Sequence, residues 1–177
     1  MDPVLLWWIG EAQMPIAPIE HVALHLRRAY GLDSLVLQSP LRPQGLFDER
    51  RKQHHSTRML EWLLRHAPTG RVLGITDVDL FIPILTFVFG EAQLGGRAAV
   101  VSTWRLREGS SDPRLLAERL AKEAVHEIGH ALGLVHCGAP LCPMSRSASV
   151  REVDRKRGQL CPDCLTLLSQ AQTRVPS

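Results

Sequence analysis

One stretch of the sequence indicates most about the local fold. It reads His126-Glu127-Ile128-Gly129-His130-Ala131-Leu132-Gly133-Leu134-Val135-His136. His126 and His130 are four residues apart, so on a helix both imidazoles project from one face. Glu127 would stand beside a metal ion held there, in the position of a general base. Gly133 can end the helix because glycine adopts the left-handed conformation without steric cost. The spacing therefore predicts a metal site at the end of a helix.

His136 is the third histidine of this stretch, and the chain can swing back after the helix to offer it as a ligand. Three neutral imidazoles leave the fourth zinc position open for water, which is typical of a catalytic site and not of a closed structural one. The alternative is a buried helix whose histidines only form hydrogen bonds in a core. We favour the metal, because three imidazoles on an apolar helix would be costly to bury without one.

The four cysteines of the chain form a second constellation. Cys137 and Cys142 precede a loop, and Cys161 and Cys164 follow it. Two short-spaced pairs separated in this way are typical of a closed four-thiolate zinc site, whose role would be to fold the C-terminal segment. Two disulfides are the alternative, but an internally bridged CxxC pair is strained and usually redox-active.

The chain resembles the archaemetzincins, metzincin-like zinc peptidases with a second zinc ion held by four cysteines. The resemblance covers about residues 70 to 170. It implies a peptide or protein substrate and two zinc ions per chain, one catalytic and one structural. One departure is the gap between Met144 and Cys161, which is a residue shorter than the family's pattern. The resemblance is carried by HEIGHALGLVHC (126–137), Cys142-Pro143-Met144, CPDC (161–164), GITDVDLFIP (74–83), FVFGEA (87–92) and GGRAAVVS (95–102).

The resemblance also implies roles for residues outside the metal motifs. Met144 would form the Met-turn, an apolar floor beneath the zinc-binding imidazoles, although a lone methionine otherwise fills core gaps. The only tyrosine is Tyr30, so an oxyanion-stabilising tyrosine after the Met-turn, found in some metzincins, is absent. The substrate would lie extended and pair with an edge strand. We expect that edge at Gly95, Gly96, Arg97, Ala98, Ala99 and Val100.

Short apolar runs alternate with helical stretches along the first half of the chain. Strands are expected at 4–10, 34–38, 71–76 and 98–103, and helices at 18–30, 56–66 and 117–132. This order predicts an α/β (α+β) fold with a mixed, largely parallel sheet and helices packed against it. We expect one metzincin-like domain over 1–177, with an N-terminal subdomain at 1–133 and a zinc-stapled C-terminal subdomain at 134–177.

Composition is that of an ordinary soluble domain, with 45% hydrophobic and 22% charged residues. A formal charge of +3 does not call for a nucleic acid or a membrane as partner. The apolar segment at 4–9 is too short to span a bilayer and lacks the features of a secretory signal. With cysteines suited to thiolate ligation, the expected location is the cytoplasm.

Three functions are compatible with these features. The leading one is a zinc-dependent metallopeptidase that uses zinc-activated water, with Glu127 as general base. A peptide-binding protein with a metalloprotease-like cleft and little turnover is an alternative, but it would not need that carboxylate. A nucleic-acid-binding zinc module is the other, but it leaves three histidines without a role. Substrate preference, endopeptidase against aminopeptidase action, regulation and oligomeric state stay open.

Overall fold

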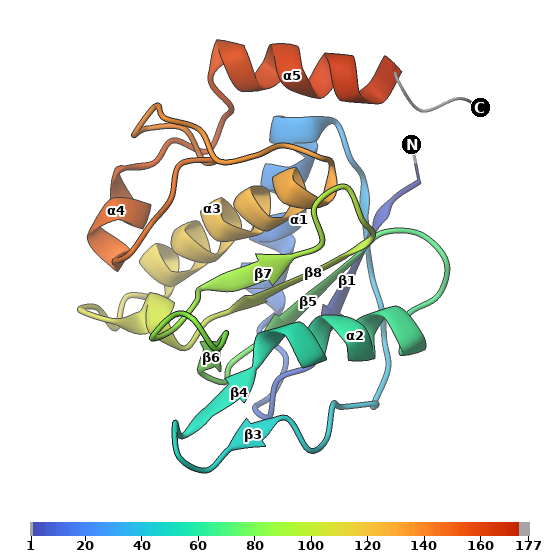
Figure 1. Ribbon diagram of the computed structural model, residues 1–177, viewed down its shortest axis with the longest axis vertical. Helices are drawn as coiled ribbons and strands as arrows, with labels where there is room; N and C mark the ends of the chain where they lie inside the picture. Colours follow the sequence, from blue (N-terminus) through green and yellow to red (C-terminus); the bar gives the residue numbers. More distant parts are fainter. Residues whose placement is uncertain (1, 174–177) are drawn as a thin grey trace.

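A five-stranded sheet runs through the centre of the fold, which the computed structural model describes for residues 2–173 (Figure 1). The strand order is β2-β1-β5-β8-β7. The first four strands run parallel, and β7 pairs antiparallel with β8. Every residue of β5 and β8 is buried, as expected for strands covered on both faces. The strands are β1 (Val4–Trp8), β2 (Ser34–Val36), β5 (Val72–Thr76), β7 (Gly90–Ala92) and β8 (Ala98–Ser102).

Helices cover both faces of this sheet, and successive strand residues alternate between two cores. Leu73 and Val101 belong to the core beneath α1 and α3, whereas Val72 and Val100 belong to the core beneath α2. Figure 1 shows α1 and α3 side by side on one face and α2 on the other. The three helices are α1 (Ile16–Tyr30), α2 (Ser56–His66) and α3 (Pro113–Ala131).

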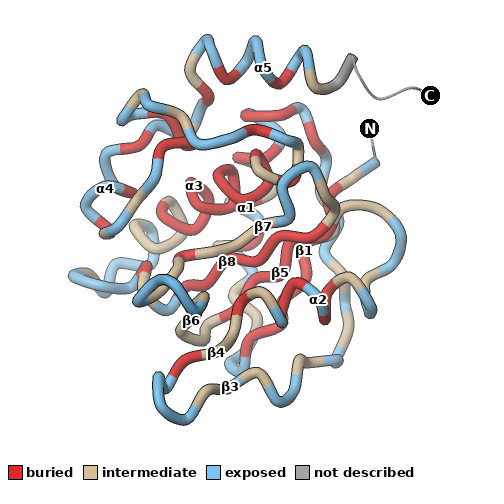
Figure 2. Tube along the Cα trace, in the orientation of Figure 1, coloured by how far each residue is buried: buried red, intermediate tan, exposed pale blue. Residues whose placement is uncertain are grey.

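A smaller sheet and a C-terminal segment complete the described chain. In Figure 2, α3 is buried along most of its length below the C-terminal loops, and α5 carries many exposed residues. None of the helices in 2–173 has the length and hydropathy needed to cross a membrane. The remaining elements are β3 (Phe47–Asp48), β4 (Gln53–His55), β6 (Leu80–Phe81), the 3-10 helix η1 (Arg105–Arg107), α4 (Val150–Arg155) and α5 (Pro162–Thr173), with β3, β4 and β6 forming the smaller sheet in the order β3-β4-β6.

The predicted α/β architecture with a mixed sheet is confirmed, and six of the seven expected elements lie within two residues of their expected bounds. Helix α3 begins four residues earlier than the apolar stripe indicated. Asp112 accepts a hydrogen bond from the backbone N–H of Arg114 at 2.9 Å, and Pro113 occupies the first turn. An N-cap and a proline at the first helical position favour a helix start there.

The prediction that 95–100 form a sheet edge is wrong. Ala98, Ala99 and Val100 lie in β8, which pairs with β5 on one side and β7 on the other. Gly95 and Gly96 lie in the turn between β7 and β8, with Gly95 at φ +65°. Arg97 follows them, and its guanidinium donates hydrogen bonds to backbone carbonyl oxygens, among them that of Leu64. The edge beside α3 is therefore β7.

Candidate metal centres and active site

Helix α3 presents the motif at its C-terminal end because its apolar residues hold it in the core. Leu120, Ala124 and Ile128 are fully buried at helical spacing. Gly133 adopts φ +94°, its N–H donates to the His130 carbonyl, and the N–H of Leu134 donates to the Gly129 carbonyl, each at 2.9 Å. These two bonds form a Schellman motif that ends the helix and turns the chain back.

The three predicted histidines converge. Their candidate ligand nitrogens all lie within 4.8 Å of one another. The ring centroids of His126 and His130 are 4.6 Å apart, and that of His136 lies 5.3 Å and 4.7 Å from them. The Nε2 atoms of His126 and His130 are 3.1 Å apart. This is close to the separation of two nitrogens on one tetrahedral zinc ion, about 3.4 Å for bonds near 2.1 Å.

In His126 and His130, the ring nitrogen Nδ1 is held by a hydrogen bond to a backbone carbonyl. Nδ1 of His126 lies 2.7 Å from the Pro143 carbonyl oxygen, and Nδ1 of His130 lies 2.8 Å from that of Leu134. A carbonyl can only accept, so both rings carry their proton on Nδ1 and leave Nε2 free for a metal. Burial also lowers the pKa of each of these histidines, which keeps the rings neutral.

His136 differs from the other two because it is exposed and bonds to a cation. Nε of Arg146 donates to Nδ1 of His136 at 3.0 Å. Burial lowers the pKa of His136, and the charges of His130 and Arg146 lower it further. A cavity of about 470 Å³ opens beside this ring, and both Arg146 and Arg155 line it. His136 thus forms the solvent-facing side of the histidine cluster.

Glu127 is buried beside the histidines and close to the sheet edge. A Cβ at Gly90, the first residue of β7, would lie 2.8 Å from both Cγ and Oε1 of Glu127. Only glycine therefore lets β7 pass this close to the carboxylate. Burial raises the pKa of Glu127 well above its ordinary value, and the negative charges of Glu123 and Glu91 raise it further, while Lys156 acts in the opposite direction.

Met144 packs against α3 at Gly129, the residue before His130. It is fully buried, and its sulfur lies 3.8 Å from the hydroxyl of Tyr30, which donates to the Val125 carbonyl at 2.7 Å. A Cβ at Gly129 would lie 2.6 Å from the Tyr30 hydroxyl and 2.9 Å from Cε of Met144. The only tyrosine is thus part of the site's support, a role that its distance in sequence concealed.

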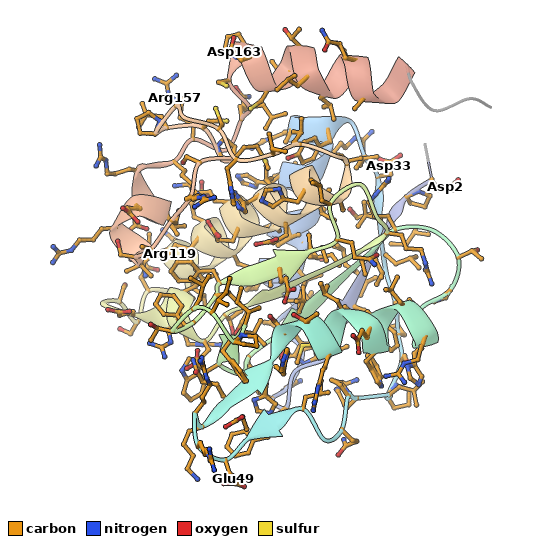
Figure 3. The ribbon with its side chains drawn as sticks, in the orientation of Figure 1. Asp2, Asp33, Glu49, Arg119, Arg157 and Asp163 are labelled. Atoms are coloured by element: carbon orange, nitrogen blue, oxygen red, sulfur yellow. The ribbon has the colours of Figure 1, made fainter. Side chains whose placement is uncertain are left out.

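Charged side chains join α3 to the C-terminal segment behind the site. Nε and Nη2 of Arg119, labelled in Figure 3, donate to the two carboxylate oxygens of Asp154 on α4 at 2.7 and 2.8 Å. Nζ of Lys156 donates to Oε1 of Glu123 inside the protein. Both pairs link residues more than thirty positions apart, so the sequence carried no local signal for them.

The four cysteines meet in one cluster, and all are free thiols. The Sγ atoms of Cys137 and Cys161 are 3.7 Å apart, as are those of Cys142 and Cys164. A disulfide would require about 2.05 Å, whereas two thiolates on a tetrahedral zinc ion stand about 3.8 Å apart for Zn–S bonds near 2.3 Å. The donor set and spacing therefore fit zinc and exclude the disulfide alternative in this structure.

Comparisons with known proteins agree with this geometry. The model of peptidase family M54 matches residues 68–170. An archaemetzincin of Haloquadratum walsbyi is 40% identical over 150 residues, covering 81% of this chain and 87% of that protein. One of Archaeoglobus fulgidus is 40% identical over 146 residues, covering 82% and 88%.

Solved structures extend the likeness to nearly the whole chain. The crystal structure of archaemetzincin from Methanopyrus kandleri superposes with a TM-score of 0.85 at 35% identity, covering 98% of this chain and 96% of that one. A zinc-dependent peptidase from Methanocorpusculum labreanum gives 0.80 at 27% identity, with 93% and 99% covered. The chain therefore belongs to peptidase family M54, the archaemetzincins, and is a zinc metallopeptidase that takes two zinc ions and acts on peptide or protein substrates.

Proposed function

We propose that His126, His130 and His136 hold the catalytic zinc ion of this metallopeptidase and that Glu127 is its general base. The convergence of three imidazole rings beside one buried carboxylate carries the assignment. We assign the second, structural zinc ion to Cys137, Cys142, Cys161 and Cys164, with no open position, and Met144 to the floor beneath the catalytic site.

Glu127 supplies the proton transfers of peptide hydrolysis. A bound zinc ion supplies Lewis acidity and lowers the pKa of a coordinated water towards about 7. The Glu127 carboxylate accepts the proton that the attacking water loses, and it returns this proton to the departing amide nitrogen. Its enclosed position keeps bulk water from competing for that proton, and burial tunes its pKa upward for this exchange.

We propose that the substrate pairs with β7 in place of the edge first predicted. In the pairing of β7 with β8, the Phe89 carbonyl accepts from Ser102 and the Gln93 N–H donates to Ala98. Because antiparallel bonds alternate, the backbone groups of Gly90 and Ala92 point away from β8. An extended peptide bonded to this edge would pass Glu127, which lies against Gly90.

The test is turnover of a peptide library by the parent, Glu127→Gln and Glu61→Gln, read by mass spectrometry alongside zinc content. Glu61 is an exposed carboxylate on α2 and serves as the control. We expect the parent and the control to cleave alike, and Glu127→Gln to keep both zinc ions while losing about 10²-fold or more in rate. Unchanged cleavage by a zinc-loaded Glu127→Gln would remove Glu127 from the mechanism.

We further propose that the protein works in the cytoplasm, because four thiolate ligands require reducing conditions to stay free. Fractionation of cells with an antibody against the chain tests this proposal.

We also propose that 1–133 and 134–177 act as two subdomains on either side of the histidine cluster. Protease digestion after zinc removal tests this, since 134–177 should be cleaved first.

A further inference from the structure

Three side chains with metal-binding groups meet where α1 packs against α3, away from the two zinc sites in sequence. His21 and His25 come from successive turns of α1, and Glu118 comes from the first half of α3. Their candidate ligand atoms all lie within 4.8 Å of one another. His25 is buried, with 8% of its side chain exposed.

Each carboxylate oxygen of Glu118 faces a different imidazole. Oε2 lies 2.8 Å from Nε2 of His21, which is a hydrogen bond. Oε1 lies 3.7 Å from Nε2 of His25, which is too long for one. A nitrogen and an oxygen on one tetrahedral zinc ion stand about 3.4 Å apart for bonds near 2.1 Å. The longer distance therefore suits two ligands of one ion better than a direct bond.

His25 is oriented as His126 and His130 are. Its Nδ1 lies 3.1 Å from the His21 carbonyl oxygen, so the proton sits on Nδ1 when the ring is neutral. The Nε2 lone pair then points at a carboxylate, an arrangement that requires a cation between them or a second proton on the ring. The ring centroids of His21 and His25 are 4.4 Å apart, close to the 4.6 Å of His126 and His130.

The surroundings leave room and charge for a cation. A Cβ at Gly158 would lie 3.3 Å from Nε2 of His25, so the glycine lets this loop pass without crowding the nitrogen. Burial acts to raise the pKa of Glu118, but the bond from His21 and nearby positive charges keep that pKa below its ordinary value. Its carboxylate is thus ionised at neutral pH and available as a ligand.

We propose that His21, His25 and Glu118 bind a third divalent metal ion of the zinc class. Two imidazoles and one carboxylate are borderline donors that suit zinc and its neighbours, and not calcium or magnesium. His21 and Glu118 are 33% and 40% exposed, so water can complete the coordination. The ion joins α1 to α3, the helix that carries His126 and His130, and so ties occupancy of this site to the stability of the helix pair.

Zinc counting after equilibrium dialysis tests the proposal. The zinc-loaded parent, His21→Ala, Glu118→Gln and His66→Ala are dialysed against buffered micromolar free zinc, and bound metal is measured by mass spectrometry. His66 is the matched control because its Nδ1 also lies near the carbonyl four residues earlier, at 2.8 Å, on a helix without a second histidine. We expect three zinc ions in the parent and in His66→Ala, and two in the other variants.

Thermal unfolding gives a second, independent measurement. Added zinc should raise the Tm of the parent and of His66→Ala beyond that of the two-zinc form, and it should leave the Tm of His21→Ala and Glu118→Gln unchanged. Retention of two zinc ions by those variants shows that they are folded. The proposal is overturned if the parent stops at two zinc ions, as a protonated His25 paired with Glu118 would require. It is also overturned if a third ion remains in both variants.

Discussion

Nζ of Lys156 donates to Oε1 of Glu123 at 2.9 Å, and the two side chains are only 1% and 4% exposed. Glu123 lies one turn before Glu127 on α3, and Lys156 directly follows α4. A buried cation from the C-terminal segment is therefore neutralised one helical turn from Glu127, the proposed general base. Burial raises the pKa of Glu123, and Lys156 opposes that rise.

Replacing one partner of this pair should destabilise the protein strongly. Lys156→Met leaves Glu123 buried without a counter-charge, which costs about 3–5 kcal/mol of unfolding free energy. Urea unfolding of the zinc-loaded protein measures the loss. The double variant Lys156→Met/Glu123→Leu should recover most of it, because neither charge then remains buried. A single variant as stable as the parent would show that the ion pair contributes nothing to the fold.

Replacing Glu91 should shift the acid limb of the pH–rate profile, the pH range in which kcat/KM falls as the pH drops. Glu127 must be ionised to act as base, so kcat/KM falls as the pH drops through its pKa in the free enzyme. The negative charge of Glu91 helps to raise this pKa. In Glu91→Gln that contribution is removed, the pKa of Glu127 falls, and the acid limb moves to lower pH. A pH–rate profile measures the shift.

Glu61→Gln is the control for that profile and should leave the limb in place, since Glu61 is exposed on α2. Partial loss of the bonds that Glu91 accepts from Ser56 and Thr57 would lower the rate at every pH without moving the limb. A limb that stays fixed or moves to higher pH in Glu91→Gln contradicts the assignment of Glu127.

A side chain at Gly129 should disturb the packing of Tyr30 and Met144 against α3. Gly129→Ala places a methyl group against the Tyr30 hydroxyl and Met144, and both of these residues are buried. Overpacking of this kind costs about 1–3 kcal/mol. Gly138→Ala is the matched control, because a Cβ there meets nothing within 4 Å. Chemical unfolding of both variants measures the difference in unfolding free energy. Equal stabilities would mean that Tyr30 and Met144 can move to accommodate the methyl group without cost.

The two metal sites should be lost separately. Cys161→Ala removes a thiolate from the closed site, so it should lose one zinc ion and unfold the segment around α5. His136→Ala should lose the other zinc ion and keep α5 folded. Zinc counting and far-UV circular dichroism distinguish the two outcomes, with Asp163→Asn as an exposed neighbour that should keep both ions. Loss of both ions in either variant would contradict independent sites.

Features fixed by local spacing could be predicted from the sequence. The four-residue step from His126 to His130 and the glycine three residues later specify a helix and its end, and the structure has both. The true sheet edge could not be predicted, because β7 is three residues long and contains no β-branched residue. The apolar run of β8 gave the stronger signal, but such a run is typical of a strand paired on both sides.

Contacts between residues far apart in the sequence could not be predicted either. His21 and Glu118 are 97 positions apart, and only the packing of α1 against α3 brings them together. The same holds for Gly90, whose closeness to Glu127 depends on where the edge strand passes the helix. No periodicity in the sequence records either contact.

Crystallography with anomalous diffraction at the zinc edge locates each zinc ion and its ligands directly. We predict one peak about 2.0–2.1 Å from Nε2 of His126, Nε2 of His130 and a ring nitrogen of His136, with a water in the remaining position, and another about 2.3 Å from the four cysteine sulfurs. A histidine cluster without a zinc peak in the zinc-saturated protein, or a fourth protein side chain on that zinc, would contradict it.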